Sequence, residues 1–239
     1  MSAPTALVTH ADTAVGAQVV RRLVADGLNV SFTSPDAQRG RALAEETGAS
    51  AIIADAEDRR AADRAVARIA GERGRVDVLV TTPTVAPGPE ARPLTDALLR
   101  HTVATITTAA FRYGRAAFGV MRRQRSGAMV FIGGTAGLRG DPTRPALSVS
   151  LAGVTVLAQL FATEGAQYGV RAYSLCPDWT ALEENGKVNP AALANVVRWL
   201  ISDDAGVASG ATLSADAART IAIGAPTAPV RDDRDARSR

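Results

Sequence analysis

The sequence predicts an α/β protein with a single domain built on a doubly wound parallel sheet of about seven strands. Along all 239 residues, short apolar runs alternate with segments whose apolar residues recur at helical spacing. The strand-like runs are apolar without interruption, which is typical of a sheet covered by helices on both faces. Right-handed crossovers between such strands give the doubly wound arrangement of the Rossmann type.

The expected elements follow one another in a regular order. Strands are expected at residues 6–9, 29–33, 51–54, 76–81, 128–132, 171–175 and 212–215. Helices are expected at 15–24, from about 37 onward, at 59–73, at 95–123 as one long or broken helix, at 146–162 and at 190–201. The domain therefore spans residues 1–224, and residues 225–239 form a charged tail that we expect to be disordered.

Composition argues against several classes of partner. The net charge is +3, but all but one of the 27 basic residues are arginines scattered among acids, so no nucleic-acid partner is expected. The opening MSAPTALVTH does not resemble a signal peptide, and no apolar stretch reaches the ~20 residues of a membrane span, so no membrane partner is expected. The single cysteine, Cys176, excludes an internal disulfide and indicates a buried structural thiol in a cytoplasmic protein.

One segment stands out because it carries no charge at all. Residues 146–162 read ALSVSLAGVTVLAQLFA in a chain that is otherwise rich in arginine. A helix that is apolar all round is buried on more than one side. We therefore expect this segment to be a core helix, part of a subunit interface, or both.

Several short motifs follow one another at consistent spacings. They are Leu7-Val8-Thr9 followed by Gly16, Ala54-Asp55, residues 76–80, Phe111 with Met121, residues 126–130, and Ser202-Asp203 followed by Gly210 and Asp216. In this order they resemble the short-chain dehydrogenase/reductase (SDR) family from Thr5 to about Ala218. The resemblance implies a Rossmann-type fold, a nicotinamide cofactor and oxidoreductase chemistry.

The nucleotide-binding turn departs from the family pattern. That pattern is Thr-Gly-x-x-x-Gly-x-Gly, whereas His10 and Ala14 replace two of its glycines here and Asp12 lies between them. The glycines let backbone N–H groups approach a pyrophosphate at a helix N-terminus, and a carboxylate there repels it. By resemblance, only Thr9, Gly16 and the adenine-contacting Asp55 are left as vestigial cofactor positions. We expect no cofactor, and leave weak NAD(P) binding open.

The catalytic positions depart further. The resemblance implies a Tyr acid, a Lys four residues later, a Ser thirteen residues before the Tyr, and a helical Asn. Aligned on the motifs above, these four positions hold Leu147, Leu151, Gly134 and Ile106. None of these side chains donates a proton, so no catalytic residues are expected. The substrate-covering loop of the family is also reduced here, to residues 180–189.

Our leading hypothesis is a non-catalytic subunit of a hetero-oligomeric short-chain dehydrogenase. Family members associate through their fourth and fifth helices, whose apolar faces are kept in this chain. The expected partner is a paralogous active SDR subunit, with self-association through the same helices as the alternative. The expected interface residues are Ile106, Phe111, Leu151, Leu157 and Phe161.

Three alternatives remain open. The first is an enzyme resembling the halohydrin dehalogenases, whose first turn lacks the same glycines. The second is a cofactor-independent enzyme or small-molecule binding protein that uses a cleft with His10, Asp12, Asp178 and Trp179, in which a His-Asp pair transfers protons; against it, His10 is a turn residue in place of glycine and Asp12 caps the first helix. The third is an NAD(P)-dependent oxidoreductase with a relocated tyrosine. No metal site is expected, because the two histidines and one cysteine lack the spacing of a ligand set.

Overall fold

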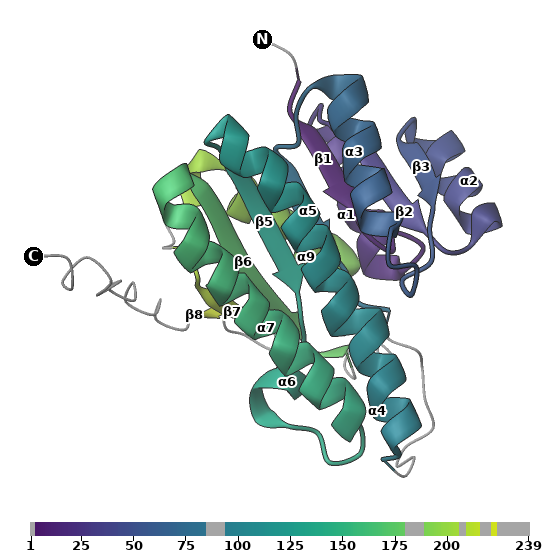
Figure 1. The fold of residues 1–239 in the computed structure, drawn as a ribbon, viewed down its shortest axis with the longest axis vertical. Helices are drawn as coiled ribbons and strands as arrows, with labels where there is room; N and C mark the ends of the chain where they lie inside the picture. The colour runs from purple at the N-terminus through teal and green to yellow at the C-terminus, as the bar shows by residue number, and fades with distance from the viewer. Residues whose placement is uncertain (1–2, 85–93, 180–188, 206–208, 216–220, 224–239) are drawn as a thin grey trace, which may run out of the picture.

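All the strands of the described residues belong to one sheet, which lies at the centre of the fold (Figure 1). A computed structural model describes residues 3–84, 94–179, 189–205, 209–215 and 221–223. Within them the strand order is β3-β2-β1-β4-β5-β6-β7-β8. The strands are Thr5–Val8, Asn29–Ser34, Ser50–Ile53, Val78–Thr81, Gly127–Ile132, Val170–Pro177, Thr212–Ala215 and Ile221–Ile223, numbered β1 to β8. β1 to β7 are parallel, which confirms the predicted doubly wound sheet.

The antiparallel strand β8 was not predicted. It pairs with β7 at the edge of the sheet, with Leu213 opposite Ile223 and Ala215 opposite Ile221. Its three residues are too few to show an alternating pattern in the sequence. The predicted disordered tail, 225–239, lies outside the described residues.

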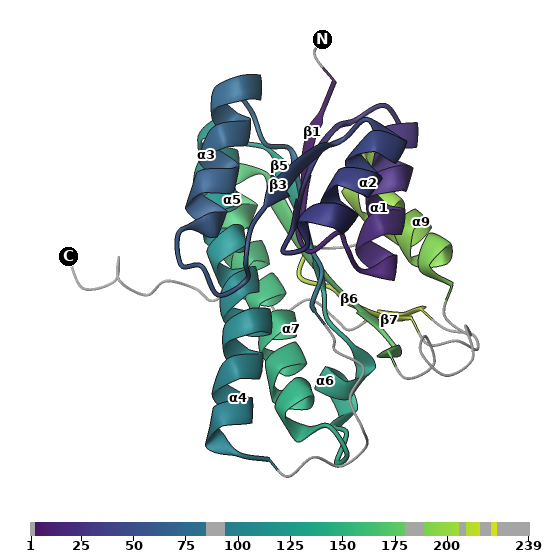
Figure 2. The same ribbon diagram turned by 90° about the vertical axis from the view of Figure 1, so that its right-hand side faces the viewer.

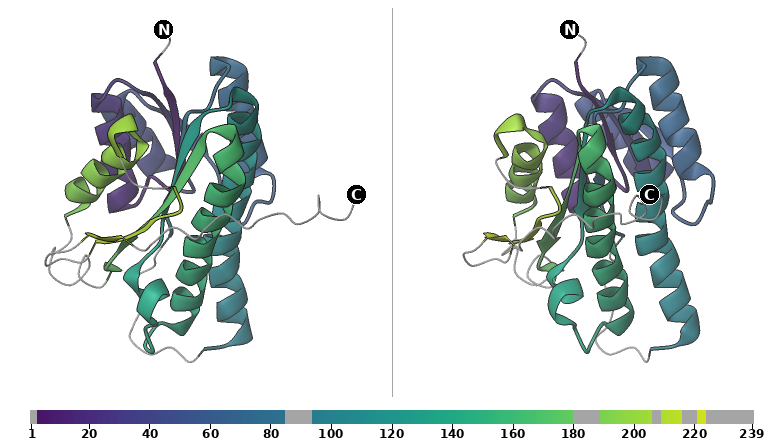
Figure 3. Two further views of the ribbon diagram at one scale, coloured as in Figure 1. Left: turned by 90° about the vertical axis from the view of Figure 1, so that its left-hand side faces the viewer. Right: turned by 60° about the vertical axis from the view of Figure 1, so that its left-hand side comes forward.

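Helices cover both faces of the sheet (Figures 2 and 3). One layer holds α1 (Ala14–Ala25), α2 (Ala37–Thr47) and α9 (Pro190–Ile201). The other holds α3 (Ala61–Arg73), α5 (Ala109–Gln124) and α7 (Pro145–Gly165). Short helices α4 (Asp96–Thr102) and α6 (Thr135–Arg139) lie with the first turns of α7 beyond the sheet, at the end where its parallel strands finish (Figure 1).

The helix predicted at 95–123 is one continuous helix whose central residues are π-helical rather than α-helical. Thr95 caps α4, and a π-helical stretch, Val103–Thr108, joins α4 to α5 without a break. Arg125 ends α5 in the left-handed conformation, with φ 56°. Such π stretches insert into α-helices where local packing demands an extra residue per turn, a detail that apolar periodicity does not show.

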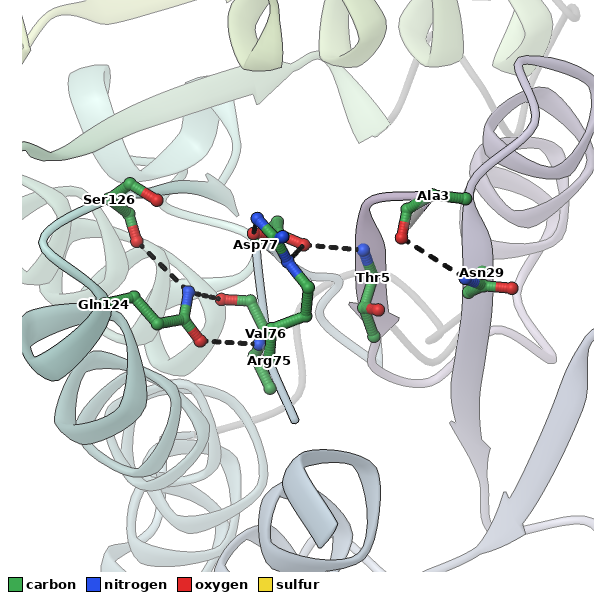
Figure 4. Close-up of polar contacts among 8 residues, drawn as sticks. All are labelled: Ala3, Thr5, Asn29, Arg75, Val76, Asp77, Gln124 and Ser126. Carbon is green, nitrogen blue, oxygen red and sulfur yellow. Dashed lines mark hydrogen bonds and ion pairs between the residues drawn. The ribbon is translucent and has the colours of Figure 1, made fainter. Parts of the chain in front are cut away.

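The opposite end of the sheet, where the parallel strands begin, is fixed by side chains (Figure 4). Asp77 accepts hydrogen bonds from the Thr5 backbone N–H at 2.8 Å and from both ends of the Arg75 guanidinium. The Gln124 side chain bonds both the N–H and the C=O of Val76, at 2.8 and 3.0 Å. Because Val76 is held by this side chain rather than by a neighbouring strand, β4 begins at Val78 and not at the predicted residue 76.

The charge-free segment forms α7, and it is longer than the sequence indicated. With the 3-10 turn that follows, it runs from Pro145 to Tyr168 and is the one helix among the described residues that is long and apolar enough to span a membrane by length and composition. The expectation that no apolar stretch reaches that length was therefore wrong. The helix packs on β5, β6 and α5, with Leu151, Val154 and Ala158 fully buried, as a core helix does.

Candidate functional site

The carboxyl ends of β1, β4, β5 and β6 meet at one edge of the sheet, where open α/β folds bind their ligands. The strand order changes direction between β1 and β4, and this point is the topological switch of the sheet. All the chemistry-bearing positions singled out in the sequence follow strands that finish at this edge or lie on helices beside it. Their side chains nevertheless fall into separate environments.

His10 is a turn residue in place of glycine, as expected. Its backbone has φ 47°, a left-handed conformation that glycine adopts most easily, and its N–H donates to Thr33 Oγ1 at 3.1 Å. The ring is 3% exposed, and its Nδ1 lies 3.1 Å from the Thr82 carbonyl oxygen. Burial lowers the pKa of His10, against the opposing effects of the Thr82 carbonyl, Asp12 and Asp55. The ring therefore points inward and is neutral near pH 7.

The alternative in which His10 pairs with an aspartate has no hydrogen bond to support it among the described residues. The His10 ring hydrogen-bonds the Thr82 carbonyl, and among the described residues one buried carboxylate oxygen of Asp12 has no hydrogen-bond partner. Asp12 also does not cap α1, contrary to expectation. Thr13 does so instead: its hydroxyl accepts from the Gly16 N–H at 3.1 Å and donates to the His10 carbonyl at 3.0 Å. A β-extended residue immediately before the helix has the geometry that capping needs, and that residue is Thr13.

Gly16 is required by the turn itself. A Cβ atom at Gly16 would lie 2.8 Å from both Ala11 Cα and the His10 carbonyl oxygen, closer than real contacts allow. This glycine, which the family pattern also has, is thus needed so that the first turn of α1 can lie against the backbone of His10 and Ala11, the residues that lead into the helix. Its presence alone does not indicate a nucleotide.

The ends of β2 and β3 carry two carboxylates with local roles. Asp36, which the sequence reasoning passed over, caps α2 by accepting from the Gln38 and Arg39 N–H groups at 2.8 and 3.0 Å. Asp55 is exposed after β3 and accepts from the Glu57 N–H at 2.8 Å. The signal for Asp36 was present in the sequence, since an Asp one residue before a helix is a common cap.

The position aligned with the family's serine is filled by a neighbouring ring. A Cβ atom at Gly134 would lie 2.7 Å from Trp179 Cδ1 and Nε1 and 2.8 Å from Leu151 Cδ1. The Trp179 indole N–H donates to the Gly133 carbonyl at 2.8 Å, and the residue is 7% exposed. Trp179 thus closes the end of β5, and there is no room for a side chain at Gly134.

The other aligned positions are apolar and mostly enclosed. Leu151 is fully buried, and Ile106 is 4% exposed beside a small cavity that Thr9 and His10 also line. That cavity has a volume of about 10 Å³, the room of a single water molecule. Leu147 is half-buried.

A larger cleft lies beside these positions, between α6, the start of α7 and the end of β6. Its volume is about 220 Å³. Its lining residues are Thr135, Ala136, Arg139, Gly140, Asp141, Arg144, Leu147, Asp178 and Trp179. Of the predicted cleft residues, the structure brings Asp178 and Trp179 to this cleft, whereas His10, Asp12 and Asp55 lie elsewhere. Thr135, Arg139 and Arg144 were missed; two arginines flanking the Gly140-Asp141 turn just before a charge-free helix were the available signal.

Three of the five expected interface residues are core residues. Ile106, Leu151 and Phe161 are 4%, 0% and 7% exposed, so within the single chain they pack in the core rather than on the surface. Phe161 stacks on Phe131, with ring centroids 5.5 Å apart. Because α7 is apolar all round, its sequence could not show which side faces the sheet. Phe111 is 43% exposed and Leu157 is half-buried.

The outer side of these helices does carry exposed apolar residues. Val149, Val156 and Leu160 of α7 are 55%, 51% and 60% exposed. They lie at positions i, i+7 and i+11 and so form one stripe along the helix. We call these three residues with Phe111 of α5 the outer stripe.

The remaining reactive groups have structural settings. Cys176 is buried, as predicted, with its Sγ 3.4 Å from Ser174 Oγ and 3.6 Å from Thr155 Oγ1. His101 lies on the helix surface, as expected, with Nδ1 2.8 Å from Glu57 Oε1. Within the described ranges, no group of three or more His, Cys, Asp or Glu side chains is placed to hold a metal ion.

Comparisons with known proteins agree with the fold. Residues 4–192 match the family model described as short chain dehydrogenase. The chain is 29% identical over 228 residues to the 3-oxoacyl-[acyl-carrier-protein] reductase MabA of Mycobacterium tuberculosis (strain ATCC 25618 / H37Rv), covering 88% of this chain and 90% of the relative. It is 25% identical to the 3-oxoacyl-[acyl-carrier-protein] reductase FabG of Escherichia coli (strain K12), covering 87% of this chain and 93% of the relative.

Solved structures share the same architecture. A short chain dehydrogenase from Mycobacterium smegmatis matches with a TM-score of 0.82 and 23% identity, covering 92% of this chain and 94% of that one. The structure of ElxO with NADP bound matches with a TM-score of 0.80 and 18% identity, covering 90% of this chain and 98% of that one. At these identities the likeness establishes the fold.

Proposed function

The chain belongs to the short chain dehydrogenase family, and we propose that it is a catalytically defective member that serves as the non-catalytic subunit of a hetero-oligomeric dehydrogenase. Its partner is then an active paralogue of the same fold. The 3-oxoacyl reductases to which the chain is similar make ketone reduction the reaction of that partner's class. The expected cytoplasmic location remains part of this proposal.

The observation that carries the proposal is the apolar filling of the reaction centre. Reduction of a carbonyl needs a proton donor beside the substrate oxygen. Leu147 and Leu151 have no proton to donate, and Trp179 and Leu151 occupy the space that a side chain at Gly134 would need. Restoring one residue would not reopen the centre, because the neighbouring side chains have filled it.

The nucleotide turn supports the same conclusion. A pyrophosphate bound at the start of α1 needs unpaired backbone N–H groups and a favourable charge. The Thr13 hydroxyl already occupies the Gly16 N–H, and the Asp12 carboxylate lies at the same helix end. Asp36, the acid nearest the end of β2, is engaged at the start of α2. These residues do not fit a dinucleotide, and we derive no reaction step through one.

A relocated redox site has little support. Tyr113 and Tyr173 are 3% and 0% exposed, and burial raises the pKa of Tyr113, which disfavours its ionised form. Tyr168 lies beyond the end of α7, with its ring 5.8 Å from the Arg122 guanidinium carbon. None of the three tyrosines lines the cleft described above. The halohydrin dehalogenase reading also lacks support, because the Ser, Tyr and Arg it needs match Gly134, Leu147 and Leu151.

The outer stripe supports association. Exposed apolar side chains that gather on one side of a helix are typical of interaction sites. The stripe lies on α7 and α5, the helices that the sequence predicted as the contact surface, although on their outer rather than their sheet-facing sides. Self-association through this stripe is the alternative to a paralogous partner.

Native mass spectrometry on tagged protein purified from its own source tests the proposal. We expect a mixed oligomer with a second chain of similar mass and no nucleotide held by this chain. Recovery of copies of this chain alone would replace the hetero-oligomer with self-association. Oxidation of NADPH by the purified chain with a 3-oxoacyl thioester would refute the catalytic defect, and a FabG-type reductase assayed in parallel serves as the positive control.

A second function is favoured by one specific observation, the cleft of about 220 Å³ beside the filled reaction centre. A protein that lost its redox chemistry and kept a cleft with polar and apolar walls can bind a small molecule without a cofactor. This function is compatible with a role as a subunit, since ligand binding and association use different surfaces.

A further inference from the structure

All the charged side chains of α5 are positive. The helix has no Asp or Glu and carries four arginines, Arg112, Arg115, Arg122 and Arg123. Among them, only Arg115 forms an ion pair within the described residues, with Asp63 of α3 at 3.1 Å. The other three positive charges of this helix therefore have no carboxylate beside them in the part of the chain that the structure describes.

Two of these arginines contact uncharged groups. Arg112 Nη1 donates to the backbone carbonyl of Glu57 at 3.4 Å rather than to its carboxylate. The Arg122 guanidinium carbon lies 5.8 Å from the centre of the Tyr168 ring. A ring face attracts a cation but carries no net charge, so it does not neutralise Arg122. The helix dipole favours arginines in the last turn of α5, but it does not account for Arg112 and Arg115 in the first half.

Part of this positive charge lies on the same face as the outer stripe. Phe111, Arg115 and Arg122 are at positions i, i+4 and i+11, so they lie along one line of α5. Both arginines are exposed. Helices α5 and α7 lie side by side (Figures 1 and 3), and Arg122 reaches Tyr168 just beyond the end of α7. The apolar side chains of the stripe are therefore accompanied by two exposed arginines.

The charge of this face opposes self-association. In a two-fold symmetric dimer the same surface is present on both sides of the interface. Helix α5 provides no carboxylate and α7 provides one, at Glu164. The arginines of one copy would therefore face mainly arginines or apolar side chains of the other. Like charges opposed across an interface lower affinity, and so does a charge buried without a partner.

The partner has to match both components of this surface. A nucleic acid would pair with the arginines but leave the apolar side chains of the stripe without matching contacts, since protein–DNA interfaces are polar. A protein face with apolar residues flanked by Asp or Glu covers both. We infer that the outer stripe binds an acidic face of a paralogous subunit in preference to a second copy of this chain. The inference rests on the proposed function and adds to it the charge of the partner's face.

A charge-reversed copy of this chain provides an acidic probe of the same shape. Arg115→Glu/Arg122→Glu replaces two exposed arginines, so the full chain should stay folded, and circular dichroism checks this. Fluorescence-detected sedimentation velocity measures how tightly the wild-type chain binds the labelled probe and, separately, a labelled wild-type chain. We expect the charge-reversed probe to bind at least about tenfold more tightly, because repulsion across the interface becomes attraction.

The matched control makes the same change in net charge in the opposite helix layer. Arg39→Glu/Arg41→Glu replaces two exposed arginines of α2, and it should bind the wild-type chain no more tightly than the wild-type chain binds itself. Salt gives a second readout. Raising NaCl from about 0.05 M to about 0.5 M should weaken binding of the charge-reversed probe but not self-association of the wild-type chain, because salt screens an attraction in the first pair and a repulsion in the second.

The failures of the inference and of the proposed function are distinguishable. Equal binding of the wild-type and charge-reversed probes would overturn the inference, and so would a control that binds as tightly as the charge-reversed probe. Native mass spectrometry that recovers only copies of this chain would refute the hetero-oligomer, even where the stripe prefers the acidic probe. A second chain without acidic residues on the helices that match α5 and α7 would refute the charge preference and leave the hetero-oligomer standing.

Discussion

At the scale of single residues, Trp179 and Gly134 form the most informative pair. Gly134 has φ −177°, an extended conformation open to any residue, so only space excludes a side chain there. Gly134→Ala should lower the free energy of unfolding by ~1–3 kcal/mol because its Cβ meets the Trp179 ring. Trp179→Ala should lower it by ~3–5 kcal/mol through the cavity it leaves. In urea unfolding, the double variant should lose at least ~1 kcal/mol less free energy of unfolding than the two single variants lose when added together.

Gly71 provides the control for this pair. It lies within α3, and a Cβ atom there meets nothing within 4 Å. Gly71→Ala should therefore raise the free energy of unfolding by ~0.5–1 kcal/mol, the opposite sign from Gly134→Ala. Additive costs in the Gly134 and Trp179 double variant would show that the ring does not fill the space.

His10 should make stability depend on pH. Its pKa is 6.5 in the unfolded chain and lower in the folded one, because burial disfavours the charged ring. As pH falls below 6.5 the unfolded chain binds a proton that the folded chain refuses, so the free energy of unfolding falls until the folded pKa is passed. His10→Asn, which also tolerates the left-handed backbone, should flatten this dependence between pH 7 and 5. Chemical unfolding across that range measures it, and parallel curves for the two proteins would contradict it.

Some residue roles at this site could be predicted from the sequence and others could not. The turn role of His10 and the burial of Cys176 followed from residue type and spacing, since both depend on the local chain. The cap at α1 did not, because Asp12 and Thr13 are both good caps and only the backbone angle chooses between them. The filling of Gly134 by Trp179 could not be predicted either. It joins β5 to the end of β6, and nothing local to either segment indicates that contact.

At the scale of elements, α7 has two apolar sides with different roles. Leu151 faces the sheet and is fully buried, whereas Leu160 is 60% exposed. Leu151→Ala should lower the free energy of unfolding by ~2–5 kcal/mol. Leu160→Ala should change it by less than ~0.5 kcal/mol in dilute protein. Urea unfolding of both variants measures the contrast, and equal costs would mean that the sides of α7 are assigned wrongly.

Most elements were predictable because the sheet is buried on both faces. Continuous apolar runs between helical patterns place seven parallel strands to within a residue or two. The exceptions have local causes. β4 starts late because the Gln124 side chain takes the hydrogen bonds of Val76, and β8 is too short to carry a pattern. The side of α7 that meets the sheet was beyond prediction, since the segment 146–162 has no charged residues to mark a solvent-facing side.

At the scale of the whole molecule, the proposals use surfaces that do not coincide. The cleft of about 220 Å³ is built from α6, the first turn of α7 and the end of β6. The outer stripe runs along α7 from Val149 to Leu160 and includes the exposed Phe111 of the neighbouring helix α5. α7 contributes its first turn to the cleft and its outer side to the stripe, so substitutions on the stripe can test association without touching the cleft.

Placing charge on the outer stripe should therefore separate the subunits and leave the chain folded. Leu160→Glu and Val156→Glu put a carboxylate at positions that are 60% and 51% exposed in the single chain, so folding should tolerate them. In an apolar interface the same carboxylate loses its water without gaining a partner, and association should weaken at least about tenfold. Ile53→Glu is the matched control, because Ile53 is 52% exposed but lies on β3 at the far edge of the sheet. Sedimentation velocity over a range of concentrations reads out the assembly. If Ile53→Glu dissociates it as strongly as Leu160→Glu, the interface lies elsewhere and the role of α7 in assembly must be abandoned.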